Sequence, residues 1–251
     1  MKTSKLLGFA LIGASIGYLQ SLLNISLSSA FLLLFAILFA EVFLKGLFLR
    51  ALSPPKYKLA QYELLSSSDQ AELLRYTEQL KQLGFQPISD LTISKTEDQR
   101  PFGRLFAHPQ KLCFAEIGIL ENIPVYCSIF SYFEEDWSMG ITNIDASRSL
   151  SAVSYAFMRL PRRLAKTSKG ESVDRLFQSF LNWRSQVSAD LSLVPLQDMD
   201  TSTYSQKEAE VRTDQRRSLL RKSIIWCLLE MLIFRINPKD EWLGAYKPIA
   251  S

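Results

Sequence analysis

One acid, Glu116, stands in the otherwise apolar residues 112–120 and is the side chain best suited to proton chemistry. Burial among apolar neighbours disfavours a charged carboxylate and raises its pKa, which is how proteins tune a general acid or base. The sequence assigns no second acid or base to act with Glu116. We therefore treat it as a candidate polar site and predict no catalytic residue.

Other catalytic and metal-binding patterns are weak. His108 is the only histidine in 251 residues, and Pro109 follows it, which favours a turn. One histidine rules out a multi-histidine metal site, and a Ser-His-Asp or Cys-His site would have to use this residue. The acids at 134–136 could hold a hard cation, but a charged hairpin turn explains them as well and is the interpretation that we prefer. No glycine-rich nucleotide motif, HExxH or GxSxG occurs, so we predict no cofactor and no metal.

Two groups of basic residues give the strongest electrostatic signal. Residues 159–169 contain no acid, and residues 212–222 contain only Asp214. The two groups are Arg159, Arg162, Arg163, Lys166 and Lys169, and Arg212, Arg216, Arg217, Arg221 and Lys222. Beside a membrane such residues attract anionic lipid head groups, at about 1 kcal/mol each. They are candidates for membrane-surface or partner binding, and a solvated face with ion pairs remains the alternative.

Nucleic acid is disfavoured as a partner. The net charge is only +4, whereas nucleic-acid-binding domains are usually clearly basic. No aromatic residues alternate with the basic ones, as they do on surfaces that stack single-stranded bases.

Two apolar runs near the N-terminus predict a membrane anchor. Residues 6–23 carry no charge, and residues 30–49 carry only Glu41 and Lys45. Helices of about 18 to 20 residues match a hydrocarbon layer of about 30 Å. We predict a transmembrane helical hairpin in residues 1–55, with spans at about 6–23 and 29–50. A signal peptide is the alternative, but no convincing cleavage site follows the first run.

The flanking charges predict the orientation of this hairpin. Basic residues lie on both outer sides of it and not in its turn: Lys2, Lys5, Lys45, Arg50, Lys56 and Lys58. By the positive-inside rule, both termini and the main domain face the cytoplasm. Three cysteines without CxxC spacing fit reduced thiols in that compartment.

Glu41 and Lys45 form a candidate intramembrane pair, since their i,i+4 spacing lets the side chains meet on one helix face. Charged residues within a span raise the question of a transport pathway. We prefer an interfacial position, where the lysine reaches water.

Residues 56–251 predict one cytoplasmic α+β domain. Asp69, Glu72 and Gly84 have the positions of a capping box and a C-terminal cap, which indicates a helix over about 69–84. Period-two patterns then predict strands at 88–94, 102–107, 112–120, 125–133 and 138–143, with a further strand at 152–160. Because the connections are short, we predict a mainly antiparallel sheet of about 5–6 strands packed by helices.

The faces of this predicted sheet are both apolar. Neither face of residues 112–120 or 125–133 alternates to charge, so we expect helices or a partner on both sides. An even-numbered turn at 121–122 would place Cys113 and Cys127 on opposite faces.

Two further helices are predicted at about 171–188 and 204–236. The apolar end of the second, 223–236, is too short to span a bilayer and contains Glu230. We expect Trp226, Leu229, Met231 and Phe234 to pack against the sheet or a second subunit. An interfacial position stays open.

Two functions follow as hypotheses. The leading one is a membrane-anchored, non-enzymatic interaction or assembly protein that binds a protein partner or itself, with possible membrane-surface contacts. The alternative is a membrane-associated enzyme that acts on a lipid or small ligand through a pocket near Glu116. A polar-lined pocket converging on Glu116 would favour the alternative, and a flat apolar patch would favour the first.

Overall fold

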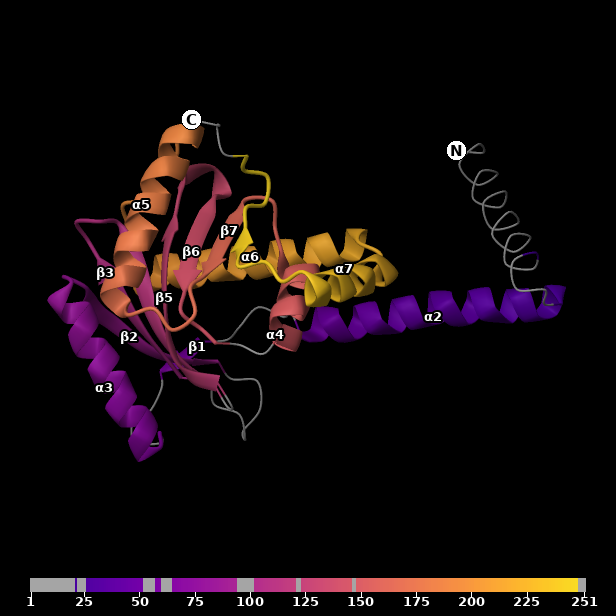
Figure 1. Cartoon of the computed structure of the whole chain (residues 1–251), viewed down its shortest axis with the longest axis horizontal. Coiled ribbons are helices and arrows are strands. Elements are labelled where there is room, and N and C mark those ends of the chain that lie inside the picture. Colours follow the sequence, from indigo (N-terminus) through magenta and orange to yellow (C-terminus); the bar gives the residue numbers. More distant parts are fainter. Residues whose placement is uncertain are drawn as a thin grey trace.

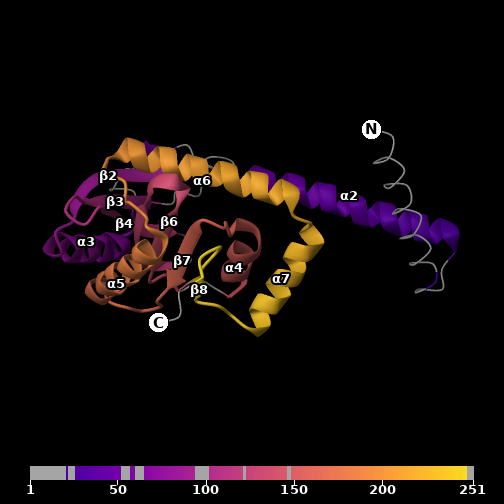
Figure 2. The same cartoon turned by 90° about the horizontal axis from the view of Figure 1, so that it is seen from above.

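The computed structural model describes residues 21, 26–51, 57–59, 65–93, 102–120, 123–145 and 148–247. An α+β domain carries helix α2 (Leu27–Ala51), which projects away from it (Figure 1). Helices cover both faces of the sheet, as Figure 2 shows from above. The predicted α+β class is confirmed.

Strands β1 to β8 form one sheet in sequence order. Their bounds are β1 (Tyr57–Leu59), β2 (Gln86–Ile93), β3 (Phe102–His108), β4 (Cys113–Leu120), β5 (Ile123–Tyr132), β6 (Ser138–Thr142), β7 (Arg163–Thr167) and β8 (Glu241–Trp242). Neighbouring strands are antiparallel except β6 and β7, which are parallel. The predicted strands from 88 to 143 are confirmed with small shifts at their ends.

The strand predicted at 152–160 is wrong. This segment is helical, with α4 (Arg148–Val153) continuing as a π-helical turn η3 (Ser154–Met158). Ala152, Ala156 and Phe157 are buried, and their spacing of four and five residues follows a helix face. The segment joins β6 to β7, and parallel neighbours require such a crossover.

The predicted orientation of Cys113 and Cys127 is also wrong. The β4–β5 register shifts between Gly118 and Leu120, and beyond that irregularity Ile117 faces Cys127 while Ala115 faces Ile129. A shift of one residue moves every later side chain to the other face. Both cysteines therefore lie in the same buried cluster, and both are free thiols.

Helices α3 (Ser67–Gln82) and α5 (Val173–Leu191) cover the face that contains these cysteines. They confirm the helices predicted at 69–84 and 171–188. Ser66 rather than Asp69 caps α3, because its hydroxyl accepts a hydrogen bond from the Asp69 amide at 3.1 Å. Gly84 has a φ of 92°, which suits its predicted role after the helix.

The single helix predicted at 204–236 is broken into α6 (Thr201–Arg221) and α7 (Ile224–Ile236). Lys222 and Ser223 are extended, and the Lys222 amide closes α6 by donating to the carbonyls of Ser218 and Leu219. Helix α6 lies across the second face of the sheet, whereas α7 turns away at the end of the domain (Figure 2). The break coincides with the change from a polar to an apolar sequence.

The domain covers only part of α7, so the predicted contact with a second subunit stays a prediction. Trp226 and Leu229 are 59% and 44% exposed. Met231 and Phe234 do pack inward, but α7 contacts α4, η3 and α2 rather than the sheet. The helix is therefore a cover for the crossover segment.

Helix α2 is long and apolar enough to cross a membrane over Ser28–Arg50, and no residue of its most apolar 18-residue stretch is buried. It corresponds to the second predicted span. The first span, at 6–23, lies outside the described residues except for residue 21. Among the described residues, α2 is the one helix long and apolar enough to span a membrane.

Candidate functional site

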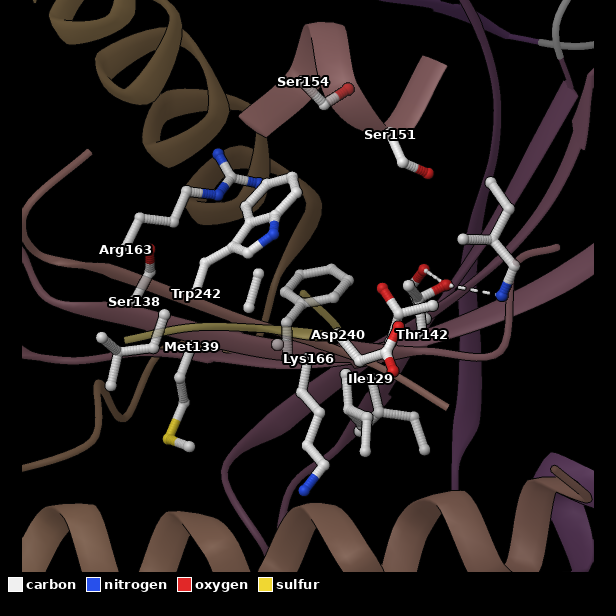
Figure 3. A pocket seen from close by; sticks show the side chains of 18 of the residues that line it. Ile129, Ser138, Met139, Thr142, Ser151, Ser154, Arg163, Lys166, Asp240 and Trp242 are labelled. Carbon is white, nitrogen blue, oxygen red and sulfur yellow. Dashed lines mark hydrogen bonds between the residues drawn. The ribbon is translucent and has the colours of Figure 1, made fainter. Parts of the chain in front are cut away.

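A cavity of about 550 Å³ lies over β5, β6 and β7 on the sheet face covered by α6. The crossover segment, α7 and β8 complete its walls through Ser151, Ser154, Phe234 and Trp242. Figure 3 shows Trp242 and Arg163 on the side of the sheet that faces the two serines, whereas Met139 and Lys166 point to the other side. The cavity is thus bounded by strands that are close in the fold and by segments distant in the sequence.

Three acids line the cavity, Glu116, Glu208 and Asp240, and the first two form a hydrogen-bonded cluster with their neighbours. The Tyr204 hydroxyl donates to Glu116 Oε2 at 3.2 Å, and the Tyr132 hydroxyl donates to Glu208 Oε1 at 3.0 Å. Arg163 lies 3.6 Å from Glu208. Two carboxylates, two phenols and one guanidinium therefore meet beside the cavity.

The pKa of Glu116 is raised to about 7, first by burial and then by the negative charge of Glu208. The hydrogen bond from Tyr204 and the charge of Arg163 lower it, but less strongly. A carboxyl with this pKa is partly protonated near neutral pH, so it can donate a hydrogen bond as well as accept one.

Glycines make room for this cluster. A Cβ atom on Gly103 would lie 2.9 Å from Glu116 Oε1, closer than such contacts normally occur. Gly103 pairs with Gly118, where a Cβ would overlap the ring of Tyr126. Two glycines on neighbouring strands therefore leave the space that Glu116 and Tyr126 occupy.

The arrangement can bind a ligand that has an apolar body and a polar group. Phe130, Phe234 and Trp242 provide apolar wall, while Glu116 and Arg163 provide hydrogen bonds and charge. Within the described residues, no group of three or more His, Cys, Asp or Glu side chains could hold a metal ion.

Sequence reasoning singled out Glu116 but missed its partners. Tyr132 came from a predicted strand, yet nothing in the sequence ties it to Glu208, 76 residues further on. Tyr204 is 88 residues from Glu116. Only the placement of α6 over this face brings them together.

His108 and the acids at 134–136 lie away from this cavity. His108 is the last residue of β3 and packs between Phe85 and Phe177, with ring centroids 5.0 and 5.6 Å away. Burial lowers the pKa of its imidazole. The acids form a tight turn, η2 (Glu134–Asp136). Arg162, from outside the turn, donates to the Glu135 carbonyl at 2.8 Å.

The first basic group is distributed among separate interactions rather than gathered on one patch. Its ion pairs are Arg159–Glu230 at 3.0 Å, Arg163–Glu208 at 3.6 Å, Lys166–Glu241 at 2.6 Å and Lys169–Asp145 at 3.0 Å. The second group follows α6 to its end, where Arg217 pairs with Asp214 at 3.2 Å and Lys222 donates to the Ala156 carbonyl at 3.3 Å. Membrane or partner binding by these residues stays a prediction.

Glu41 and Lys45 form the expected pair, with 3.1 Å between Oε1 and Nζ. The pair faces the domain, because Ser223 at the start of α7 lies 3.4 Å from Glu41 Oε2. It connects α2 to the corner between α6 and α7.

Comparison of the chain with protein-family models, curated proteins and solved structures found no match.

Proposed function

We propose that this is a membrane-anchored, non-enzymatic binding protein that takes a small amphipathic molecule in the cavity beside Glu116. In this proposal α2 and the predicted span at 6–23 form a hairpin in the bilayer, with both termini and the domain on the cytoplasmic side. Tagging each terminus with a reporter that is active only outside the cytoplasm should give no signal. A signal at the C-terminus would contradict this topology.

The observation that carries the binding proposal is the convergence of Glu116, Glu208 and Arg163 on one wall of a cavity of about 550 Å³. This volume falls in the usual range for small-molecule sites, which combine apolar walls with a few placed polar groups. The aromatic wall suits the apolar body of a ligand, and the polar wall suits a head group that exchanges hydrogen bonds.

Two other functions have support from particular features. The raised pKa of Glu116 is what an enzyme with a general acid or base would need. The exposed apolar side chains of α7 are what a protein partner or a second copy would cover. We favour small-molecule binding because Glu116, Glu208 and Arg163 converge on the same cavity.

The test is to purify the full chain in mild detergent, denature it and identify released small molecules by mass spectrometry. Ala165→Phe places a ring into the cavity from β7. Ala71→Phe, on the exposed surface of α3, is the matched control. We expect one compound at near-stoichiometric amount with the unmodified chain and the control, and at least about tenfold less with Ala165→Phe, since filling a site removes most of its affinity. Equal amounts in all three samples, or no compound in any, would contradict the proposal.

A further inference from the structure

Helix α7 presents an unusually large apolar surface. Its exposed side chains are Ile225, Trp226, Leu228, Leu229, Leu232, Ile233 and Ile236. The opposite face, with Ile224, Cys227 and Phe234, is buried against the domain and α2. An exposed apolar patch of this kind marks a surface that something else covers.

Three charged side chains at this end of the domain, Glu41, Lys45 and Glu230, are held in ion pairs. Glu230, in the middle of α7, pairs with Arg159 at 3.0 Å, and its side chain is only 19% exposed. Glu41 and Lys45 pair with each other beside Ser223. The exposed surface of α7 is therefore apolar apart from Arg235 in its last turn, even though the helix also contains an acid.

The point at which α7 meets α2 limits where the lipid surface can lie. Helix α7 crosses α2 where Ser223 meets Glu41, at the end of the domain from which α2 projects (Figure 2). The part of α2 beyond that contact, from Ser28 to Ala40, is about 13 residues and so about 20 Å long. A hydrocarbon layer is about 30 Å thick. If α2 crosses a bilayer, the lipid must therefore extend to the level of α7.

We propose that α7 lies in the membrane interface with its exposed side chains in lipid, so that the domain rests on the bilayer surface. This inference depends on the membrane anchoring proposed above. Helices that lie in the interface bury one apolar face at the boundary between head groups and acyl chains. The alternative to lipid is the protein partner or second subunit that the sequence analysis predicts on this helix.

The charges that flank α7 match an anionic bilayer. Arg221 and Lys222 stand at its start, and Arg235 and Lys239 stand at its end. Basic residues at both ends of an apolar helix face are attracted to anionic lipid head groups while the apolar face enters the membrane. Trp226 adds a side chain that favours the boundary between lipid and water.

The test uses the full chain in vesicles of phosphatidylcholine and phosphatidylglycerol, with a nitroxide label on one introduced cysteine. The native cysteines are buried, which limits their labelling. Leu232→Cys reports on α7, and Leu74→Cys on α3 is the control, because these leucines are 55% and 50% exposed. Helix α3 lies at the other end of the domain (Figure 1). We expect the label at 232 to collide more with oxygen than with a water-soluble nickel complex, and the label at 74 to show the reverse.

A third label, at Phe35→Cys in the projecting part of α2, separates this inference from the anchoring proposal. A label in lipid at 35 but in water at 232 would overturn the interfacial position and leave the anchor intact. Labels in water at both sites would overturn both. Shielding at 232 from both reagents, with spin–spin broadening, would assign the surface to a second copy and would also overturn the inference. In the background of Leu229→Asp, the label at 232 should move toward water, because the acid disfavours immersion.

Discussion

Glu116 is the residue on which the chemistry of the cavity depends. Its carboxyl is held between a donor, Tyr204, and a competing negative charge, Glu208. Since the pKa is about 7, its protonation changes over the physiological range. The site can therefore present either a donor or a second negative charge to a ligand.

The raised pKa of Glu116 predicts a specific pH dependence of stability. The pKa of a glutamate side chain in water is about 4.5, and that of Glu116 in the folded protein is about 7. The folded state therefore binds this proton more tightly than the unfolded state, so the contribution to stability is full below pH 4.5 and is lost as the pH rises through 7. The shift corresponds to as much as about 3 kcal/mol.

Glu116→Gln stays uncharged, so the free energy of unfolding of this variant should exceed that of the unmodified chain at pH 8. At pH 5 the two values should be close. Denaturant unfolding of the full chain in detergent at both pH values measures this difference. The same pH dependence in both proteins would show that Glu116 does not titrate as described.

A side chain at position 103 should displace the carboxyl of Glu116. In Gly103→Ala the new Cβ would lie 2.9 Å from Glu116 Oε1, so the carboxyl that accepts from Tyr204 must shift. We expect a loss of about 1 kcal/mol in stability, as for other overpacked sites, and less co-purified ligand. Gly46→Ala, where a Cβ meets no atom within 4 Å, is the control. Unchanged ligand content in Gly103→Ala would contradict this role for the glycine.

For single residues, the sequence predicts that Glu116 is buried but not which side chains surround it. An acid in an apolar strand is visible in the pattern, because its neighbours indicate burial. The contribution of Glu208 is invisible, since it occurs in a helix with many other polar residues and acquires its role only when α6 crosses the sheet. The prediction that Cys113 and Cys127 face opposite sides was wrong for a related reason, because the irregularity between Gly118 and Leu120 changes the register.

Elements with one clear period could be predicted from the sequence, and short or mixed ones could not. Helices α3 and α5 have apolar residues on one face over several turns. The segment at 152–160 is too short to distinguish two periods, and its helical form follows from the parallel pairing of β6 with β7. The corner between α6 and α7 has no proline or glycine, so nothing local signals it.

Helix α3 offers a direct test of the two-sided packing of the sheet. Leu73 is 0% exposed and faces the sheet, whereas its neighbour Leu74 is 50% exposed. Leu73→Ala should reduce the free energy of unfolding by about 2–5 kcal/mol, because it removes buried methyl groups and leaves a cavity. Leu74→Ala should change it by about 0.5 kcal/mol or less. Similar losses in both variants would show that α3 is not packed in this way.

The whole molecule combines a projecting apolar helix with a domain whose nearest helix is also apolar. These two surfaces, α2 and α7, are adjacent and are the largest exposed apolar areas of the described residues (Figure 2). Their proximity suggests that one bilayer covers both. The cavity lies directly behind α7, since Phe234 belongs to both. A ligand with an apolar body would thus be bound close to the membrane.

The central claim, that α2 crosses a bilayer with the domain on one side, is tested most directly by the sidedness of its two ends. Ser29→Cys, near the exposed start of α2, and Leu74→Cys, in the domain, are each treated with a thiol reagent that cannot cross membranes. In sealed cells the reagent should modify only residue 29, and in inverted vesicles only residue 74. Modification of both residues from the same side would contradict the account.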